Sequence, residues 1–226
     1  MATTFQRARS DAQRALRSKA ILDTAAAMLA EMPVADVSLN ELSRRVGLAK
    51  SNVLRYFDSR EAVLLELLAS SFREWLAHLA AELPSAVSRR AGFKRRAEQL
   101  AAAMSKSLAE RPVLCDLMSA QAAVLERNVS VETVTKHKLA AMADADVFGG
   151  LVRSALPELS QDDAWRYMVG AWVLTSALWA HARPPEAVLQ ACAADARLER
   201  AHLDFPVALE DYLTTLAIGL HARAAG

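Results

Sequence analysis

Apolar residues recur at intervals of three and four along most of the chain, which is the spacing of one face of an α-helix. The clearest series predicts a long helix from residue 60 to about residue 83, ended near Pro84, with an apolar side made by Leu64, Leu67, Leu68, Phe72, Trp75, Leu76 and Leu79. Further helices are predicted over 91–109, 112–127, 131–155 with an interruption at Gly149-Gly150, 163–182 and 205–222, and a shorter one after Pro184-Pro185. Because no segment alternates apolar and polar residues as a strand does, the expected fold class is all-α.

The segment 38–60 predicts two short helices that meet at a glycine. Ser38 can cap the first helix, and Glu41, three residues later, can reach back to complete a capping box. The apolar face of this helix consists of Leu39, Leu42 and Val46. Gly47 follows, where the left-handed conformation that ends many helices is expected.

The second short helix separates an apolar side from a polar one. Val53 and Phe57, four residues apart, lie toward the apolar face of the first helix, and the residues left outward are Lys50, Ser51, Leu54, Arg55 and Tyr56. This arrangement is typical of a helix-turn-helix, whose second helix fits the major groove of B-DNA. An ordinary helical hairpin is the alternative, since short helices joined by glycine are common and charged faces are often only solvated.

The distribution of charge favours the DNA-binding interpretation. Residues 1–60 hold ten Lys/Arg against six Asp/Glu, a net of +4, whereas residues 61–226 hold 17 against 20, a net of −3. A basic arm, residues 1–19, precedes the first helix and is expected to be disordered without DNA; its cations are Arg7, Arg9, Arg14, Arg17 and Lys19. The arginines of this arm can add minor-groove or phosphate contacts. Downstream, Arg60 stands in the first turn of a helix, where the dipole favours an acid, and this placement indicates a phosphate partner.

These residues resemble the TetR-like family of transcriptional regulators. The resemblance covers about the first 70 residues and rests on the first helix Ile21–Leu29, the turn Val46-Gly47-Leu48, and the signature Leu54-Arg55-Tyr56-Phe57 followed by Asp58-Ser59-Arg60. Where such regulators usually carry Tyr, His and Lys, this chain has Leu54, Tyr56 and Arg60. The resemblance implies a three-helix DNA-binding head, predicted over residues 1–60, and a larger helical body for ligand binding and dimerisation, predicted over residues 61–226.

Each outward residue has a chemistry that suits DNA. Lys50 and Arg60 can neutralise phosphates, and the hydroxyls of Ser38 and Ser51 can donate to them. Arg55 is the predicted base contact, because a guanidinium pairs with guanine O6 and N7 through two hydrogen bonds. By resemblance, Asn40 occupies a DNA-contacting position and could pair with adenine, while Tyr56 takes the place of a backbone-contacting His. Leu54 offers either an apolar contact to a thymine methyl group or shielding of the helix packing.

The resemblance also implies a homodimer on a palindromic operator, released by a small-molecule inducer or co-repressor bound inside the body. The expected dimer helices are 163–182, with Trp165, Met168, Val169, Trp172, Leu178 and Trp179, and 205–222, with Leu209, Tyr212, Leu213, Leu216, Ile218 and Leu220; Gly170 and Gly219 would allow close approach. The alternative is that these residues form the core within one chain, and some of them must do so. The candidate ligand-binding residues are Met104, Leu108, Leu117, Met118, Gln121, Leu125, Phe148, Met168, Trp172 and Thr175. The alternative for these residues is plain core, which is the commoner role of methionines and aromatics at helical spacing. Because this set is mostly apolar, a small hydrophobic or aromatic ligand is expected rather than an anionic metabolite.

Several other classes of protein are not expected. Cys115 and Cys192 lie far apart, and His78, His137, His181, His202 and His221 occur singly, so neither a disulfide framework nor a metal site is predicted and no cofactor is implied. No catalytic motif is found, so an enzyme is not expected. The uncharged stretch 167–182 is shorter than the roughly 20 residues of a membrane span, and no signal peptide is seen, which predicts a cytoplasmic protein. The remaining alternative is a helical protein-interaction module without DNA binding.

Overall fold

The computed structural model describes residues 2–195, 197–198 and 203–224, and the ordered elements in these ranges are all helical, which confirms the all-α prediction. The chain forms two compact units. The first runs up to Ser70 and also takes in Ala120–Lys138, and the second comprises Ser71–Ser119 and the chain from Leu139 onward. The predicted boundary at residue 60 marks the start of α4 (Arg60–Ala86), whereas this division falls within that helix.

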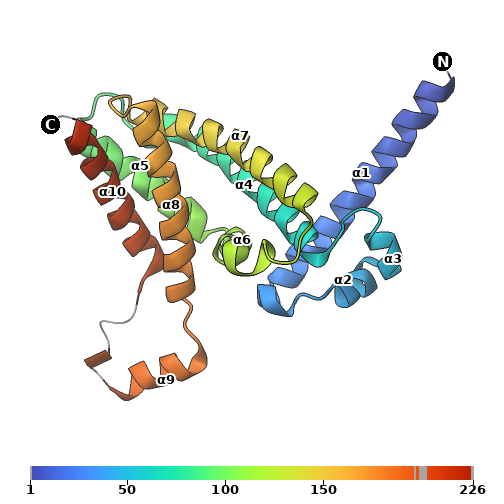
Figure 1. The fold of residues 1–226 in the computed structure, drawn as a ribbon. Helices are drawn as coiled ribbons and strands as arrows, with labels where there is room; N and C mark the ends of the chain where they lie inside the picture. The colour runs from blue at the N-terminus through green and yellow to red at the C-terminus, as the bar shows by residue number, and fades with distance from the viewer. Residues whose placement is uncertain (1, 196, 199–202, 225–226) are drawn as a thin grey trace. The chain divides into compact units, whose positions relative to one another are not determined.

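The first unit contains α1 (Ala2–Leu29), the 3₁₀ turn η1 (Val34–Asp36), α2 (Leu39–Val46), α3 (Lys50–Val53) and the beginning of α4. Its core is apolar and lies under α2 and α3: the fully buried residues include Ile21, Ala25, Met28, Leu42 and Val53. The predicted inward positions Val53 and Phe57 are both buried, so the two faces of the second short helix are confirmed. Figure 1 shows α1 passing beside α2, with which it packs.

The basic arm differs from its prediction. Residues 2–19 form the first part of α1 instead of a separate disordered arm. The physical reason lies in the composition: no glycine or proline precedes Pro33, and the arm is rich in alanine, arginine and glutamine, which are good helix formers. A single uninterrupted helix therefore leads into the head.

Gly47 ends α2 as predicted. Its φ of 71° and ψ of 29° lie in the left-handed region, and the amide of Leu48 donates to the Ser43 carbonyl at 3.0 Å. This hydrogen bond satisfies a carbonyl at the end of α2 that has no partner within the helix. The chain then turns directly into α3, whose N-cap is Ala49.

A segment distant in sequence completes the first unit. It comprises the π-helical turn η2 (Gln121–Leu125) and the beginning of α7 (Val131–Ala155). The hydroxyl of Thr133 donates to Asp58 Oδ2 at 3.0 Å, and Lys136 Nζ lies 3.7 Å from Glu66 Oε2. Residues seventy or more positions apart in sequence are thus held together by polar contacts.

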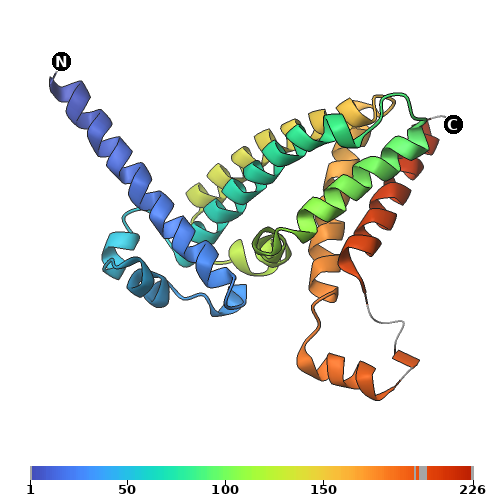
Figure 2. The same cartoon turned by 180° about the vertical axis from the view of Figure 1, so that it is seen from behind.

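The second unit is a helical bundle made by α5 (Phe93–Ala109), α6 (Pro112–Ala120), α8 (Gln161–His181), α9 (Glu186–Ala194), α10 (Phe205–Ala224) and the rest of α4 and α7. Helix α10 packs against α5 and α8, and the same three helices are seen from behind in Figure 2. An aromatic cluster of Phe72, Trp75, Phe148 and Trp172 lies in its core, with neighbouring ring centroids 5.2–6.4 Å apart. No described helix is long and apolar enough to cross a membrane.

Three helix boundaries differ from prediction. Helix α4 continues through Pro84 to Ala86, although this proline cannot donate to the Ala80 carbonyl. The buried side chains of Leu83 and Val87 anchor this last turn, and the Val87 amide donates to the Leu83 carbonyl at 2.9 Å. Helix α7 is not interrupted at Gly149-Gly150, since glycine weakens a helix by only about 1 kcal/mol relative to alanine. The predicted helix 112–127 is instead divided into α6 and η2, where the hydrogen-bonding period changes.

Gly170 allows two helices of the same chain to pack closely. A Cβ placed on it would lie 2.5 Å from Leu216 Cδ2, so the missing side chain lets α10 approach α8. Gly219, by contrast, has no heavy atom within 4 Å of such a Cβ. Gly170 thus allows a close approach between helices of the same unit, and the close approach predicted for both glycines in a dimer stays a prediction.

The left-handed turn gives a direct stability prediction. Gly47→Ala is expected to lower the free energy of unfolding by about 1–2 kcal/mol, because a Cβ is strained at positive φ while no neighbouring atom obstructs it. Gly150→Ala is the matched control: Gly150 lies within a helix with open space around it, so alanine there should stabilise by about 0.5–1 kcal/mol. Urea unfolding of both variants measures the difference, and equal effects of the two would contradict it.

Candidate nucleic-acid interface

The outward side of α3 and the turn after it form a polar surface. Lys50, Ser51, Asn52 and Arg55 are exposed, and Tyr56 is half-buried. Leu54 is 40% exposed, so it faces outward and does not join the core. The arrangement follows from packing, since Val53 and Phe57 anchor this four-residue helix to the core and turn the remaining side chains away from it.

The beginning of α2 adds two polar groups. Ser38 is the N-cap, and its hydroxyl oxygen accepts from the amide of Glu41 at 3.1 Å, which leaves the hydroxyl hydrogen available to a phosphate. Asn40 is exposed in the first turn of the helix. Both residues belong to the same unit as α3.

The capping box predicted for Glu41 does not form. Its carboxylate accepts from Arg44 Nε at 2.8 Å and from Arg45 Nε at 2.8 Å, because two guanidinium groups one turn away are stronger partners than a backbone amide. Arg44 and Arg45 together hold the pKa of Glu41 at about 2, below its ordinary value of 4.5. The pairs therefore stabilise the folded head above about pH 4.5, and this contribution is lost as the pH falls through about 2.

Residues of α1 extend the surface. The Arg14 guanidinium lies 5.8 Å from the ring centroid of Tyr56, and its Nη2 donates to the Arg55 carbonyl at 3.5 Å. A hollow of about 380 Å³ is lined by Gln13, Arg14, Arg17, Asn52, Arg55 and Tyr56. The structure thus brings two arginines of the predicted basic arm beside the outward side of α3.

The individual roles of Gln13, Arg14, Arg17 and Asn52 at this surface were missed by the sequence prediction. Asn52 stands three positions before Arg55 in the sequence, a spacing that places the two on one face and could have revealed it. The two arginines were predicted to add minor-groove or phosphate contacts as part of the basic arm, without individual roles. Their position beside Tyr56 depends on how α1 packs, which no local pattern contains.

Arg60 lies apart from the outward surface. Its Nη2 donates to the carbonyl of Val34 at 2.7 Å, and the residue is half-buried. The Arg60 guanidinium therefore has a backbone acceptor within the first unit, while its predicted phosphate contact stays a prediction. Of the predicted DNA-contacting residues, Ser38, Asn40, Lys50, Ser51, Leu54 and Arg55 are exposed, Tyr56 is half-buried at the edge of the hollow, and Arg60 points inward.

The predicted ligand-binding residues divide between the units. Gln121 and Leu125 belong to the first, where Gln121 Nε2 donates to Glu126 Oε1 at 2.7 Å. The others lie in the second unit and are buried, apart from half-buried Trp172: Met104, Leu108, Leu117, Met118, Phe148, Met168, Trp172 and Thr175. One polar atom among them, Thr175 Oγ1, is buried without a hydrogen-bond partner.

Metal binding and thiol chemistry receive no support from the described residues. No group of three metal-ligating side chains occurs among them; His202 lies outside the described residues. Cys115 is fully buried, and burial raises the pKa of its thiol to about 12, so the reactive thiolate is scarce. Cys192 is half-buried.

Comparisons with known proteins agree with this geometry. Residues 21–67 match the family described as bacterial regulatory proteins, tetR family, and residues 69–224 match the tetracyclin repressor-like C-terminal domain. The HTH-type transcriptional regulator EthR of Mycobacterium tuberculosis is 44% identical over 52 residues, which are 23% of this chain and 24% of EthR. The match therefore spans about a quarter of that relative's length.

Solved structures share the fold over nearly the whole chain. A TetR transcriptional regulator from Rhodococcus sp. RHA1 has a TM-score of 0.55 at 16% identity, covering 93% of this chain and 98% of its own. The fatty acid degradation regulator FadR from Bacillus halodurans has a TM-score of 0.57 at 15% identity, covering 90% and 96%. FadR from Bacillus subtilis, solved with stearoyl-CoA, has a TM-score of 0.52 at 14% identity, covering 88% and 97%.

Proposed function

Because the chain belongs to the TetR family of helix-turn-helix transcriptional regulators, we propose that it is a repressor that binds a palindromic operator as a homodimer and leaves it when a small, mainly hydrophobic ligand binds. The observation that carries this proposal is the outward surface of α3, where Arg55 and Lys50 are exposed beside Asn52. An interaction module without DNA binding would leave this cationic surface unexplained.

The exposed residues divide into two roles. Lys50, with the hydroxyls of Ser51 and Ser38, suits phosphate contacts, which set the register of the protein on DNA without reading its sequence. Arg55 suits a base contact, because the side chain of Arg55 has no hydrogen bond or ion pair within the described chain and its carbonyl is held by Arg14.

Three further residues complete the proposed interface, and Arg60 stands behind it. Asn40, exposed at the start of α2, suits adenine, and the Tyr56 hydroxyl suits a backbone phosphate. Leu54 is placed for an apolar contact to a thymine methyl group. The Arg60 guanidinium already donates to the Val34 carbonyl, so its proposed role is to stabilise the first unit behind the interface.

Two variants separate base reading from phosphate binding. Arg55→Ala should weaken binding to an operator, selected from a random duplex library, by about 1–3 kcal/mol and relax specificity at one base position. Lys50→Ala should weaken operator and random DNA alike and reduce the salt slope of the binding constant by about one. Fluorescence anisotropy titrations at several salt concentrations measure both. Equal losses on operator and random DNA for the two variants would contradict the assigned roles, and no binding of any duplex would overturn the proposed function.

An apolar stripe supports the homodimer. Along α8, Trp165, Val169 and Val173 follow one another at intervals of four and are 46%, 42% and 57% exposed. On α10, the neighbouring helix of the same unit, Tyr212 and Val207 are also exposed. Apolar side chains gathered in this way favour a protein partner. A second copy of the chain is the proposed partner, because a palindromic operator requires two heads.

The dimer is tested by charging this stripe. Val173→Glu should shift the mass measured by light scattering from about twice the chain mass toward the monomer mass of 24.5 kDa, because a charge buried in an apolar interface is costly. Val131→Glu is the matched control: Val131 is 84% exposed in the first turn of α7, where an acid suits the helix dipole. Wild-type protein that is monomeric at micromolar concentration would contradict the dimer.

The ligand is proposed to enter the second unit near the aromatic cluster. Thr175 Oγ1, buried in the same unit as Phe148 and Trp172, has no partner and could donate to or accept from a polar group of an otherwise apolar molecule. Such a ligand would release the operator by binding one conformation of the dimer more tightly than the other, by an amount equal to its differential affinity. FadR from Bacillus subtilis, which has been solved with stearoyl-CoA, shows an acyl ligand on the same fold.

Thr175→Val tests whether the Thr175 hydroxyl forms a hydrogen bond with the proposed ligand. In the free protein the variant should raise the free energy of unfolding by about 1 kcal/mol, because it removes an unpaired buried polar atom and keeps the shape. Thr24→Val is the control and should not stabilise, since the Thr24 hydroxyl donates to the Ala20 carbonyl at 2.8 Å. Compounds found by thermal shift to stabilise the wild type and release operator should stabilise the variant less. Destabilisation by Thr175→Val, or unchanged response to those compounds, would contradict this role.

A further inference from the structure

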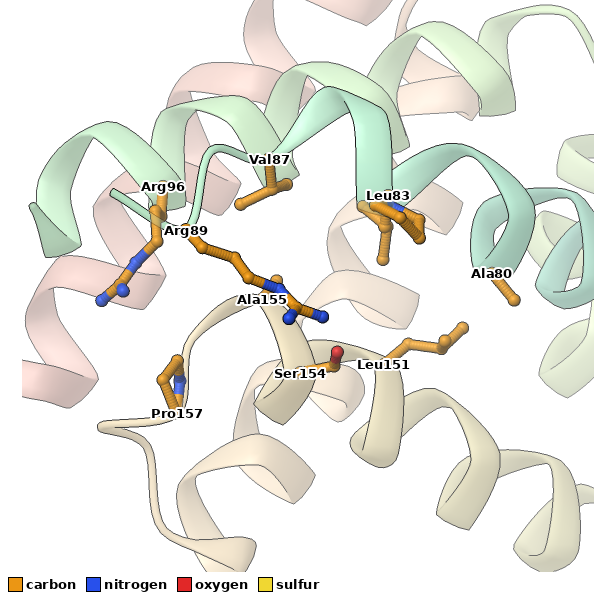
Figure 3. A pocket seen from close by; sticks show the side chains of 10 residues that line it. Ala80, Leu83, Val87, Arg89, Arg96, Leu151, Ser154, Ala155 and Pro157 are labelled. Atoms are coloured by element: carbon orange, nitrogen blue, oxygen red, sulfur yellow. The ribbon is translucent and has the colours of Figure 1, made fainter. Parts of the chain in front are cut away.

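A second hollow lies in the second unit, away from the residues considered so far. It has a volume of about 300 Å³ and is formed by the last turns of α4 and α7, the loops that follow them and the first turn of α5. Its lining includes Leu83, Val87, Arg89, Arg96, Leu151 and Ser154. Figure 3 shows the apolar side chains of Leu83 and Leu151 along one part and the Arg89 side chain crossing the hollow toward Ser154. None of the predicted ligand-binding residues lines it.

The two arginines of this hollow differ in their partners. Arg96 is more than nine-tenths buried and forms an ion pair with Glu158, so its charge is compensated. Its Nε is nevertheless buried without an acceptor. Arg89 is exposed and has no hydrogen bond or ion pair within the described chain, so its guanidinium brings an uncompensated positive charge to the hollow.

The chemistry of the lining points to one class of ligand. A free guanidinium binds a carboxylate through two parallel hydrogen bonds, and the Ser154 hydroxyl, on the side toward which Arg89 extends, adds another donor. The surfaces of Leu83, Val87 and Leu151 suit a hydrocarbon chain. Because Arg89 brings one uncompensated positive charge, a ligand with one negative charge matches the hollow. The volume of about 300 Å³ is at the small end of ligand pockets, which favours a ligand with a short hydrocarbon chain.

We propose that this hollow is a binding site for a monocarboxylate with a short aliphatic chain, held by Arg89 and Ser154 with its chain on Leu83, Val87 and Leu151. This hollow shares no residue with the proposed DNA interface or with the proposed site for an apolar ligand near Thr175. It adds a ligand class, an organic anion, that the aromatic cluster would not accept.

Octanoate is a suitable probe, and isothermal titration calorimetry measures its binding. The wild type and Arg90→Gln should bind octanoate with similar affinity, whereas Arg89→Gln should bind it at least tenfold more weakly. Arg90 is the matched control, because it is exposed and adjacent in sequence but does not line the hollow. Leu151→Trp, which fills the apolar part, should also reduce binding, and circular dichroism checks that each variant is folded.

Two further ligands define the chemistry. Octanol should bind the wild type and Arg89→Gln equally and more weakly than octanoate binds the wild type, and inorganic phosphate should not compete with octanoate. The proposal is overturned if Arg89→Gln binds octanoate as the wild type does, if Arg90→Gln loses binding equally, or if phosphate displaces octanoate. Absence of octanoate binding at millimolar concentration would overturn it as well. None of these results depends on DNA, so the outcome is separate from that of the operator experiments.

Discussion

Burial of one small apolar core determines the chemistry of the head. Helix α3 is four residues long, and a helix of that length is not stable alone in water. It exists because Val53 and Phe57 pack under it, against a core that contains Ile21, Met28 and Leu42. The same packing decides which side chains face outward, so Lys50 and Arg55 owe their exposure to residues that never touch DNA. The specificity of the surface therefore depends on the core as much as on the exposed residues.

Local patterns were sufficient for some parts of this fold and not for others. Helical periodicity predicted most of the helices, and Gly47 was recognised because a left-handed residue after an amphipathic helix has a definite chemistry. The turn at η2 was not predicted, since a change from α to π hydrogen bonding leaves little trace in the spacing of apolar residues. In the candidate interface, the outward residues of α3 followed from periodicity, whereas Arg14 and Arg17 depended on the tertiary position of α1.

Arg60 shows how a local rule can be broken for an internal reason. A cation at the start of a helix opposes the dipole, and it was therefore interpreted as a phosphate ligand. The structure provides a backbone carbonyl at Val34 as its acceptor, twenty-six residues earlier in the chain. Glu41 shows a similar effect, since two arginines replace the backbone amide that the capping pattern predicts. In both cases a partner of opposite charge or dipole outweighed a preference of local sequence.

The bond between Thr133 and Asp58 bears on how the protein is made. The first unit includes residues on both sides of a long excursion into the second, so its contacts span large sequence separations. Contacts of that kind form slowly, because closing the long intervening loop costs conformational entropy before the contacts can offset it. During synthesis, the helix-turn-helix emerges early but lacks these partners until residues near Lys138 have left the ribosome. The candidate nucleic-acid interface thus belongs to a unit whose maturation depends on chain made much later.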